Sequence, residues 1–145
     1  IKRDLGKDII NLKGAGAAGG MGGGMVAFFG STLQMGIETV LDAVNFDSLL
    51  DGADLVISGE GKIDSQSLRG KVVIGVARRT KKKRIPLIAI VGDIGDDIES
   101  VYDEGVSAVF SINRVAVPFS EAKLRCKNDL ALTMDNLMRF ISLYR

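Results

Sequence analysis

The chain has 145 residues, of which 46% are hydrophobic, and this size and composition predict a single domain with a buried core. Its 19 basic and 18 acidic residues leave a net charge of +1, which argues against nucleic acid or an anionic membrane as a partner. The absence of histidine excludes histidine-based triads and most zinc sites, so acid–base chemistry must come from carboxylates, lysine or tyrosine.

Cysteine usage and hydropathy bear on where the chain is found. Its one cysteine, Cys126, cannot form an internal disulfide, which favours an intracellular, cytoplasmic protein over a secreted one. No apolar run approaches membrane-spanning length, and no signal peptide is visible. The chain opens on Ile1 rather than on methionine, so we expect it to be a piece of a longer protein.

Glycines crowd the segment that follows a short apolar stretch, Asp8–Leu12, which could be a strand. Gly14, Gly16 and Gly19 match the G-x-G-x-x-G pattern of dinucleotide-binding folds, with a possible helix over Met21–Phe29 behind them. The same glycines could offer backbone N–H groups to a phosphate or a carboxylate. The alternative is that they serve close helix packing.

A dinucleotide-binding fold also needs an acidic residue at the end of a second strand, about 20 positions further on. Glu38 stands near that distance. The apolar residues around it repeat at helical intervals, which predicts a helix: Ile37, Val40, Leu41 and Val44. The dinucleotide pattern is therefore incomplete.

Residues 53–71 combine a strand signal with a concentration of polar groups. Leu55–Ile57 predicts a short buried strand that ends at Ser58, and Glu60 follows between two glycines. Ligands of open α/β sheets bind outside the carboxyl ends of the strands, so the polar residues here are candidate site residues. After Glu60 these are Asp64, Gln66, Ser67 and Lys71. The alternative is a solvated turn in which Asp64 or Ser67 caps the following helix.

The rest of the chain alternates helices and strands. Helices are predicted over 70–84, 96–102 and 120–145, and strands over 87–91 and 107–112. This order predicts a parallel sheet with right-handed crossovers. We expect Glu60, Asp93 and Asn113 to lie at one edge of the sheet, because each follows a buried strand of the same direction.

The first of these helices ends in a basic run. Six of the seven residues from Arg78 to Arg84 are cationic, which could mark a phosphate or nucleic-acid patch. We favour cations that stay hydrated at a helix carboxyl end, where the helix dipole stabilises them.

Three parts of the sequence carry a family resemblance: GAGAAGGMG, the stretch GIETVLDAVNFDSLLDGADLVISGEGKIDSQSLRGKVVIGVARR, and VGD. They resemble the bacterial glycerate kinase family of the GlxK/GarK type. The resemblance implies an enzyme that uses ATP and Mg²⁺ to phosphorylate a small molecule, D-glycerate, to 2- or 3-phosphoglycerate. It also implies a two-domain α/β protein, with one domain inserted into a Rossmann-like domain whose parallel sheet has helices on both faces.

Only the carboxyl-terminal part of that family is represented. We expect residues 1–35 to be the end of the inserted domain or the junction, and 36–145 to be a partial Rossmann-like domain. The partner implied is the missing amino-terminal part of the same protein, and self-association is possible through apolar surface that this part would cover.

The resemblance also implies site residues. The matching positions are Gly14, Gly16, Gly19, Gly20, Glu60, Asp64, Gln66, Ser67, Gly70 and Lys71. Glu60 or Asp64 would orient Mg²⁺ or accept the glycerate hydroxyl proton, and Lys71 or the glycine amides would stabilise phosphate or the substrate carboxylate. Gln66 and Ser67 are assigned to substrate or phosphate binding.

Two other classes of function stay open. One is an anion-binding, nucleotide-binding or oligomerising α/β domain without catalysis. The other is a dehydrogenase-like domain that binds NAD through Gly14, Gly16 and Gly19.

Overall fold

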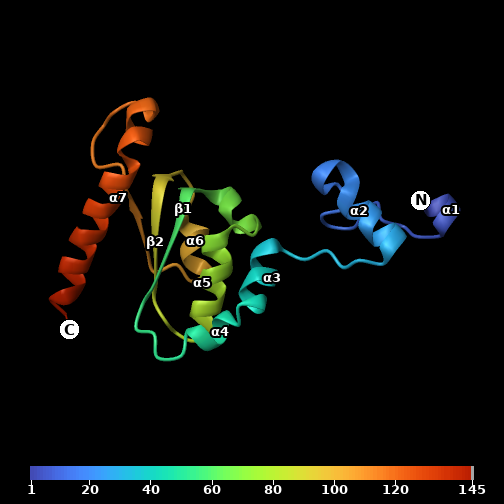
Figure 1. The fold of residues 1–145 in the computed structure, drawn as a ribbon, viewed down its shortest axis with the longest axis horizontal. Coiled ribbons are helices and arrows are strands. Elements are labelled where there is room, and N and C mark those ends of the chain that lie inside the picture. The colour runs from blue at the N-terminus through green and yellow to red at the C-terminus, as the bar shows by residue number, and fades with distance from the viewer. Residues whose placement is uncertain (145) are drawn as a thin grey trace. The chain divides into compact units, whose positions relative to one another are not determined.

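The computed structural model describes residues 1–144, apart from the side chains of Gln66 and Arg69. It divides the chain into two compact units, Ile1–Thr39 and Val40–Arg145. None of the helices in this described part is long and apolar enough to span a membrane. In chain order the elements are α1 (Lys2–Leu5), α2 (Ala17–Phe29), α3 (Gly36–Ala43), α4 (Phe46–Leu49), β1 (Val56–Ile63), the 3₁₀ helix η1 (Ser65–Arg69), α5 (Val72–Lys82), β2 (Leu87–Ile94), α6 (Glu99–Asp103), β3 (Ala108–Ser111) and α7 (Phe119–Ser142) (Figure 1).

Helix α2 of the first unit begins irregularly. Ala18, Gly19 and Gly20 have positive φ angles of 51°, 69° and 92°, so regular helix starts at Met21. Two of the three positions are glycines, which adopt such angles without a steric penalty. The regular part of α2 agrees with the helix predicted over Met21–Phe29.

The strand suggested for Asp8–Leu12 is wrong, because these residues form irregular structure and a turn. The Leu12 N–H donates to the Ile9 carbonyl at 3.2 Å, so the backbone closes on itself within the segment. A strand requires a neighbouring strand to satisfy its backbone groups, and all three described strands lie in the second unit.

The second unit contains a sheet of three parallel strands in the order β1–β2–β3. Helix α5 packs against β1 and β2 on one face, and α7 lies along the other side of the sheet (Figure 1). The predicted α/β architecture, with a parallel sheet between helices, is confirmed.

The core of this unit consists of apolar side chains from the sheet and its helices. Those with no exposed surface are Ile63, Val73, Ile74, Ala77, Leu87, Ala89 and Val101. Each fully buried valine, leucine or isoleucine contributes about 1.5–3 kcal/mol relative to exposure. The core therefore fixes α5 against β1 and β2, and with it the turn that joins β1 to α5.

The first two strands run further than the sequence indicated. β1 was expected to end at Ser58 and β2 at Val91, but their pairing continues to Ile63 opposite Ile94. Glu60 therefore lies inside a strand instead of in the turn after it.

The glycines of these strands explain the difference. A Cβ atom at Gly92 would lie 2.5 Å from the Gly61 carbonyl oxygen, so the two backbones approach more closely than any side chain would allow. Glycine is usually a sign of a turn, which is why the pattern predicted an early strand end. Here it permits close approach between neighbouring strands.

The basic end of α5 is engaged in ion pairs more than expected. Arg79 contacts Asp42 and Asp47, each at 2.6 Å. Arg78 contacts Glu104 at 2.6 Å, and other cations of the run also meet neighbouring groups: Lys83 pairs with Asp51, and Lys81 donates to the Asp103 carbonyl. These contacts tie α5 to the segments around it, so the hydrated helix end that we favoured is an incomplete description.

Candidate active site

A crevice of about 780 Å³ lies at the carboxyl ends of the three parallel strands. We call it the edge crevice, and its lining residues are Glu60, Gly61, Lys62, Gly92, Asp93, Ile112, Asn113, Val117, Phe119, Ala122, Lys123 and Cys126. Glu60, Asp93 and Asn113 all line it, so they lie at one edge of the sheet as predicted, although Glu60 and Asp93 belong to β1 and β2 instead of following them. This is the edge at which open α/β sheets bind their ligands.

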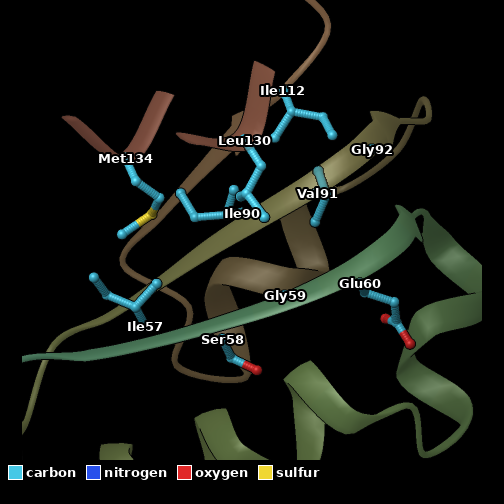
Figure 2. A pocket seen from close by; sticks show the side chains of 10 residues that line it. All are labelled: Ile57, Ser58, Gly59, Glu60, Ile90, Val91, Gly92, Ile112, Leu130 and Met134. Carbon is cyan, nitrogen blue, oxygen red and sulfur yellow. The ribbon is translucent and has the colours of Figure 1, made fainter. Parts of the chain in front are cut away.

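An apolar pocket of about 450 Å³ adjoins it, between the sheet and α7. Ile57, Ile90, Leu130 and Met134 face this pocket, as Figure 2 shows. The side chain of Glu60 points from β1 toward the opposite face, where η1 and α5 lie (Figure 2). Glu60 therefore lines both pockets, while its carboxylate lies on the α5 side.

The Glu60 carboxylate is partly withdrawn from water. Its Oε2 atom is buried and has no hydrogen-bond partner within the part of the chain that is described. Burial raises the pKa of Glu60 above its usual value; the positive charge of Lys71 lowers it in part, and the negative charge of Asp64 raises it further. A carboxylate held in this way is a stronger base than one in water.

Asp64 and Ser67 are joined at the start of η1. The Asp64 N–H donates to Ser67 Oγ at 3.0 Å, and Ser67 Oγ lies 3.4 Å from Asp64 Oδ1. Ser67 has no exposed surface. These contacts close the turn at the start of η1 and bring the Asp64 carboxylate next to the Ser67 hydroxyl.

Lys71 connects this turn to the strand before it. Its Nζ donates to the Lys62 carbonyl at 3.0 Å and lies 3.9 Å from Asp64 Oδ1. The lysine side chain is 36% exposed, so its ammonium still reaches solvent. Four predicted site residues, Glu60, Asp64, Ser67 and Lys71, thus belong to one cluster, which we call the acidic cluster. Gln66 is part of η1, but its side chain lies outside the described residues.

The predicted glycines, Gly14, Gly16, Gly19 and Gly20, belong to the first unit. A Cβ atom at Gly16, Gly19 or Gly20 would meet no atom within 4 Å, and one at Gly14 would meet only Leu33 Cδ1, at 3.5 Å. The close-packing alternative applies to their neighbour Gly22, whose Cβ would lie 2.6 Å from the Gly14 carbonyl oxygen. The four candidate glycines therefore leave open space beside the backbone.

The dinucleotide-binding pattern is not met. No strand of the described chain precedes Gly14, and Glu38 lies in α3. The pattern requires a strand before the glycines and an acidic residue at a second strand end. The structure therefore gives no support to NAD binding through Gly14, Gly16 and Gly19.

Several lining residues of the edge crevice were not recognised from the sequence. Lys62 pairs with Asp93, at 3.4 Å between Nζ and Oδ2. The sequence did not predict this pair, because both residues were placed beyond the ends of their strands. Phe119 and Lys123 lie in the first turns of α7. No local signal marks them, because only the tertiary fold brings the start of α7 to the strand ends.

This fold and crevice define a Rossmann-like α/β protein with a crevice at the carboxyl edge of its parallel sheet, the edge at which such folds bind their ligands. The profile of the glycerate kinase family matches residues 1–142. The chain therefore belongs to the glycerate kinase family.

Known proteins agree with this assignment. Over 77% of this chain, the sequence is 49% identical to glycerate 2-kinase of Escherichia coli K12. Over 97% of this chain, it is 42% identical to glycerate kinase of Haemophilus influenzae. It also matches the crystal structure of a protein assigned as glycerate kinase 2 from Salmonella typhimurium LT2, with a TM-score of 0.72, 39% identity and 98% of this chain covered. The chain spans about a third of each of these proteins, namely 29%, 37% and 36% of their lengths.

Proposed function

We propose that this chain is the carboxyl-terminal part of a glycerate kinase, which transfers a phosphoryl group from ATP to D-glycerate and releases ADP and 2- or 3-phosphoglycerate. Family membership and the names of the relatives support the reaction. Residues 1–35 would then be the end of an inserted domain or its junction, and 36–145 a partial Rossmann-like domain.

One observation carries the proposal to particular residues: a buried carboxylate oxygen of Glu60 has no partner among the described residues. Such an atom costs free energy in the folded protein unless a ligand or a proton satisfies it. We assign Glu60 as the group that accepts the proton of the attacking glycerate hydroxyl. Its raised pKa suits this task, because a base works best when its pKa approaches the working pH.

The donor set also fits a magnesium ion. Mg²⁺ is usually held by one or two carboxylates together with substrate phosphates and water. Glu60 and Asp64 provide two carboxylates close enough for the charge of one to raise the pKa of the other. The described residues contain no group of three or more acidic, cysteine or histidine side chains that could hold a metal, so the remaining ligands of the proposed ion would be phosphate oxygens and water. When bound, the ion supplies positive charge that offsets the charge of the transferred phosphoryl group.

Lys71 and the glycine segment complete the proposed machinery. The Lys71 ammonium, positioned by the Lys62 carbonyl and by Asp64, would bind a phosphate or the glycerate carboxylate. Ser67 keeps Asp64 in place, and Gln66 is assigned to the same ligands. The open backbone at Gly16, Gly19 and Gly20 would allow N–H groups to approach an anion.

The test is Glu60→Gln in the complete protein, with glycerate-dependent ADP release measured at saturating ATP and Mg²⁺. We expect kcat to fall about 10²–10⁴-fold, the range for loss of a general base. Glu99→Gln is the matched control, since Glu99 is exposed at the start of α6, outside the residues that line the edge crevice. Activity of Glu60→Gln within twofold of the control would refute the assignment of Glu60.

A further inference from the structure

The edge crevice is too large for glycerate alone. Its volume of about 780 Å³ falls in the range of about 300–1,000 Å³ that is typical of pockets for drug-sized ligands. Glycerate is a three-carbon acid, whereas the other substrate of the proposed reaction is a nucleotide. This inference rests on that proposed function and asks which substrate the crevice holds.

One wall of the crevice suits a planar base. Phe119, at the start of α7, is 82% exposed although it lines the crevice, and Ile112, Val117 and Ala122 add apolar surface. An exposed aromatic ring can stack on a nucleobase and is then shielded from water. Gly61 brings bare backbone to the crevice, and a Cβ atom there would meet no atom within 4 Å.

The polar residues of the crevice suit a ribose and phosphates. Lys62 and Lys123 provide two cations at its rim, and Asp93 and Asn113 provide oxygen and amide groups for hydroxyls or for the base edge. Lys62 is paired with Asp93 at 3.4 Å, with both side chains more than half exposed, so the pair can exchange for ligand contacts at little cost. Apolar wall, polar groups and cations together match the three parts of a nucleotide.

We propose that the adenine nucleotide binds in the edge crevice, with its base against Phe119 and Val117 and its phosphates toward Lys62 and Lys123. The carboxylate of Glu60 points to the other face of β1, toward η1 and α5 (Figure 2). Lys62 reaches the same region, because its Cε atom and the Asp64 Cβ atom both lie within 3.4 Å of the position that a Cβ at Gly95 would occupy. The phosphates bound by Lys62 would therefore lie beside the acidic cluster.

The experiment measures ADP binding to the complete protein by calorimetry, without glycerate, alongside KM for ATP and for glycerate. Phe119→Ala and Lys123→Ala should each raise the Kd for ADP and the KM for ATP about tenfold, with KM for glycerate within twofold. Phe140→Ala and Lys127→Ala are matched controls on the same helix, because neither Phe140 nor Lys127 lines the crevice. Phe140 is also exposed, at 59%.

Two further probes divide the crevice into its parts. Adenosine should lose affinity only in Phe119→Ala, and tripolyphosphate only in Lys123→Ala. Cys126 lines the crevice and is exposed, so bound ADP should slow its alkylation by iodoacetamide, followed by mass spectrometry of the peptide that contains it.

The outcomes separate this inference from the proposed function. Unchanged ADP affinity in both crevice variants, together with unprotected Cys126, would overturn the nucleotide assignment even if the protein phosphorylates glycerate. ADP binding that weakens in the crevice variants and protects Cys126 would support the assignment even if glycerate is not the acceptor.

Discussion

Glu60 is a residue whose environment opposes its charge. Its pKa in the folded protein is raised by burial, so the folded state binds a proton more tightly than the unfolded chain does. The stabilisation that comes from this residue is therefore complete below the usual glutamate pKa of 4.5 and is lost as the pH rises through the raised value. A loss of stability at neutral pH from a partly buried carboxylate is typical of a residue with a catalytic role.

This gives a prediction for stability against pH. In the complete protein Glu60→Gln should melt at or above the temperature of the wild type at pH 7.5. The reason is that glutamine carries no charge, whereas the ionised Glu60 carboxylate is destabilised by burial. The advantage should shrink as the pH falls below 4.5, where Glu60 is protonated in both states. Differential scanning calorimetry across this pH range checks the prediction. It would be contradicted if the melting temperature of the variant, minus that of the wild type, were lower at pH 7.5 than at pH 4.

Substitutions at Asp64 and Ser67 distinguish a catalytic role from a structural one. Asp64→Asn keeps an oxygen that can accept from Ser67 Oγ but removes the charge beside Lys71, so turnover should fall much more than stability. Kinetics and thermal melts of the same preparation measure both effects. A melting shift large enough to explain the lost turnover would assign Asp64 to the turn alone.

Ser67→Ala is the complementary change. It leaves the Asp64 N–H without its partner at 3.0 Å, in a place where Ser67 is fully buried. We expect a loss of about 1–3 kcal/mol in the free energy of unfolding, the usual penalty for an unsatisfied buried group. Urea titration measures it, and a neutral effect would show that the turn does not depend on this hydrogen bond.

At the scale of elements, the pairing of β1 with β2 depends on the glycine at position 92. Gly92→Ala would place a Cβ atom 2.5 Å from the Gly61 carbonyl oxygen, which belongs to the backbone and cannot move aside cheaply. We expect about 1–3 kcal/mol of destabilisation, as for other overpacked sites. Gly61→Ala is the control, because a Cβ there meets no atom within 4 Å. Equal melting temperatures for the two variants would rule out this account of the strand pair.

At the scale of the whole molecule, the chain accounts for only part of an enzyme of this family. It spans about a third of the length of its relatives, and catalysis by positioning fails when groups that position the substrates are missing. We therefore predict no glycerate phosphorylation by the 145-residue chain alone, and activity in the intact protein. A coupled ADP-release assay, with and without the separately expressed remainder, tests this. Robust turnover by the short chain would show that its own residues suffice.

The oligomerising alternative, which involves no catalysis, calls for a separate measurement. Side chains such as Leu124, 85% exposed, and Phe29, 77% exposed, leave apolar surface on both units. Such surface favours association with another chain. Light scattering of the chain, alone and with the remainder of the protein, should show self-association that the remainder suppresses.

Much of the fold follows from local patterns, and these were readable in the sequence. Strand residues such as Leu87–Val91 form continuous apolar runs, and the helices around Leu41 and along α7 repeat at helical spacing, because each pattern reflects one face of one element. The acidic cluster was also predictable in its membership, since Glu60, Asp64, Ser67 and Lys71 come from one continuous stretch whose turn brings them together.

What only the tertiary structure decided depends on contacts between distant segments. The close approach of Gly61 and Gly92 carries β1 and β2 past their predicted ends, and this puts Glu60 within a strand. The edge crevice joins residues such as Lys62, Asp93 and Phe119, which are far apart in the chain and carry no shared motif. Local propensity acts over a few residues, whereas a crevice is formed by packing across the whole unit, so its walls could not be derived from any one stretch of sequence.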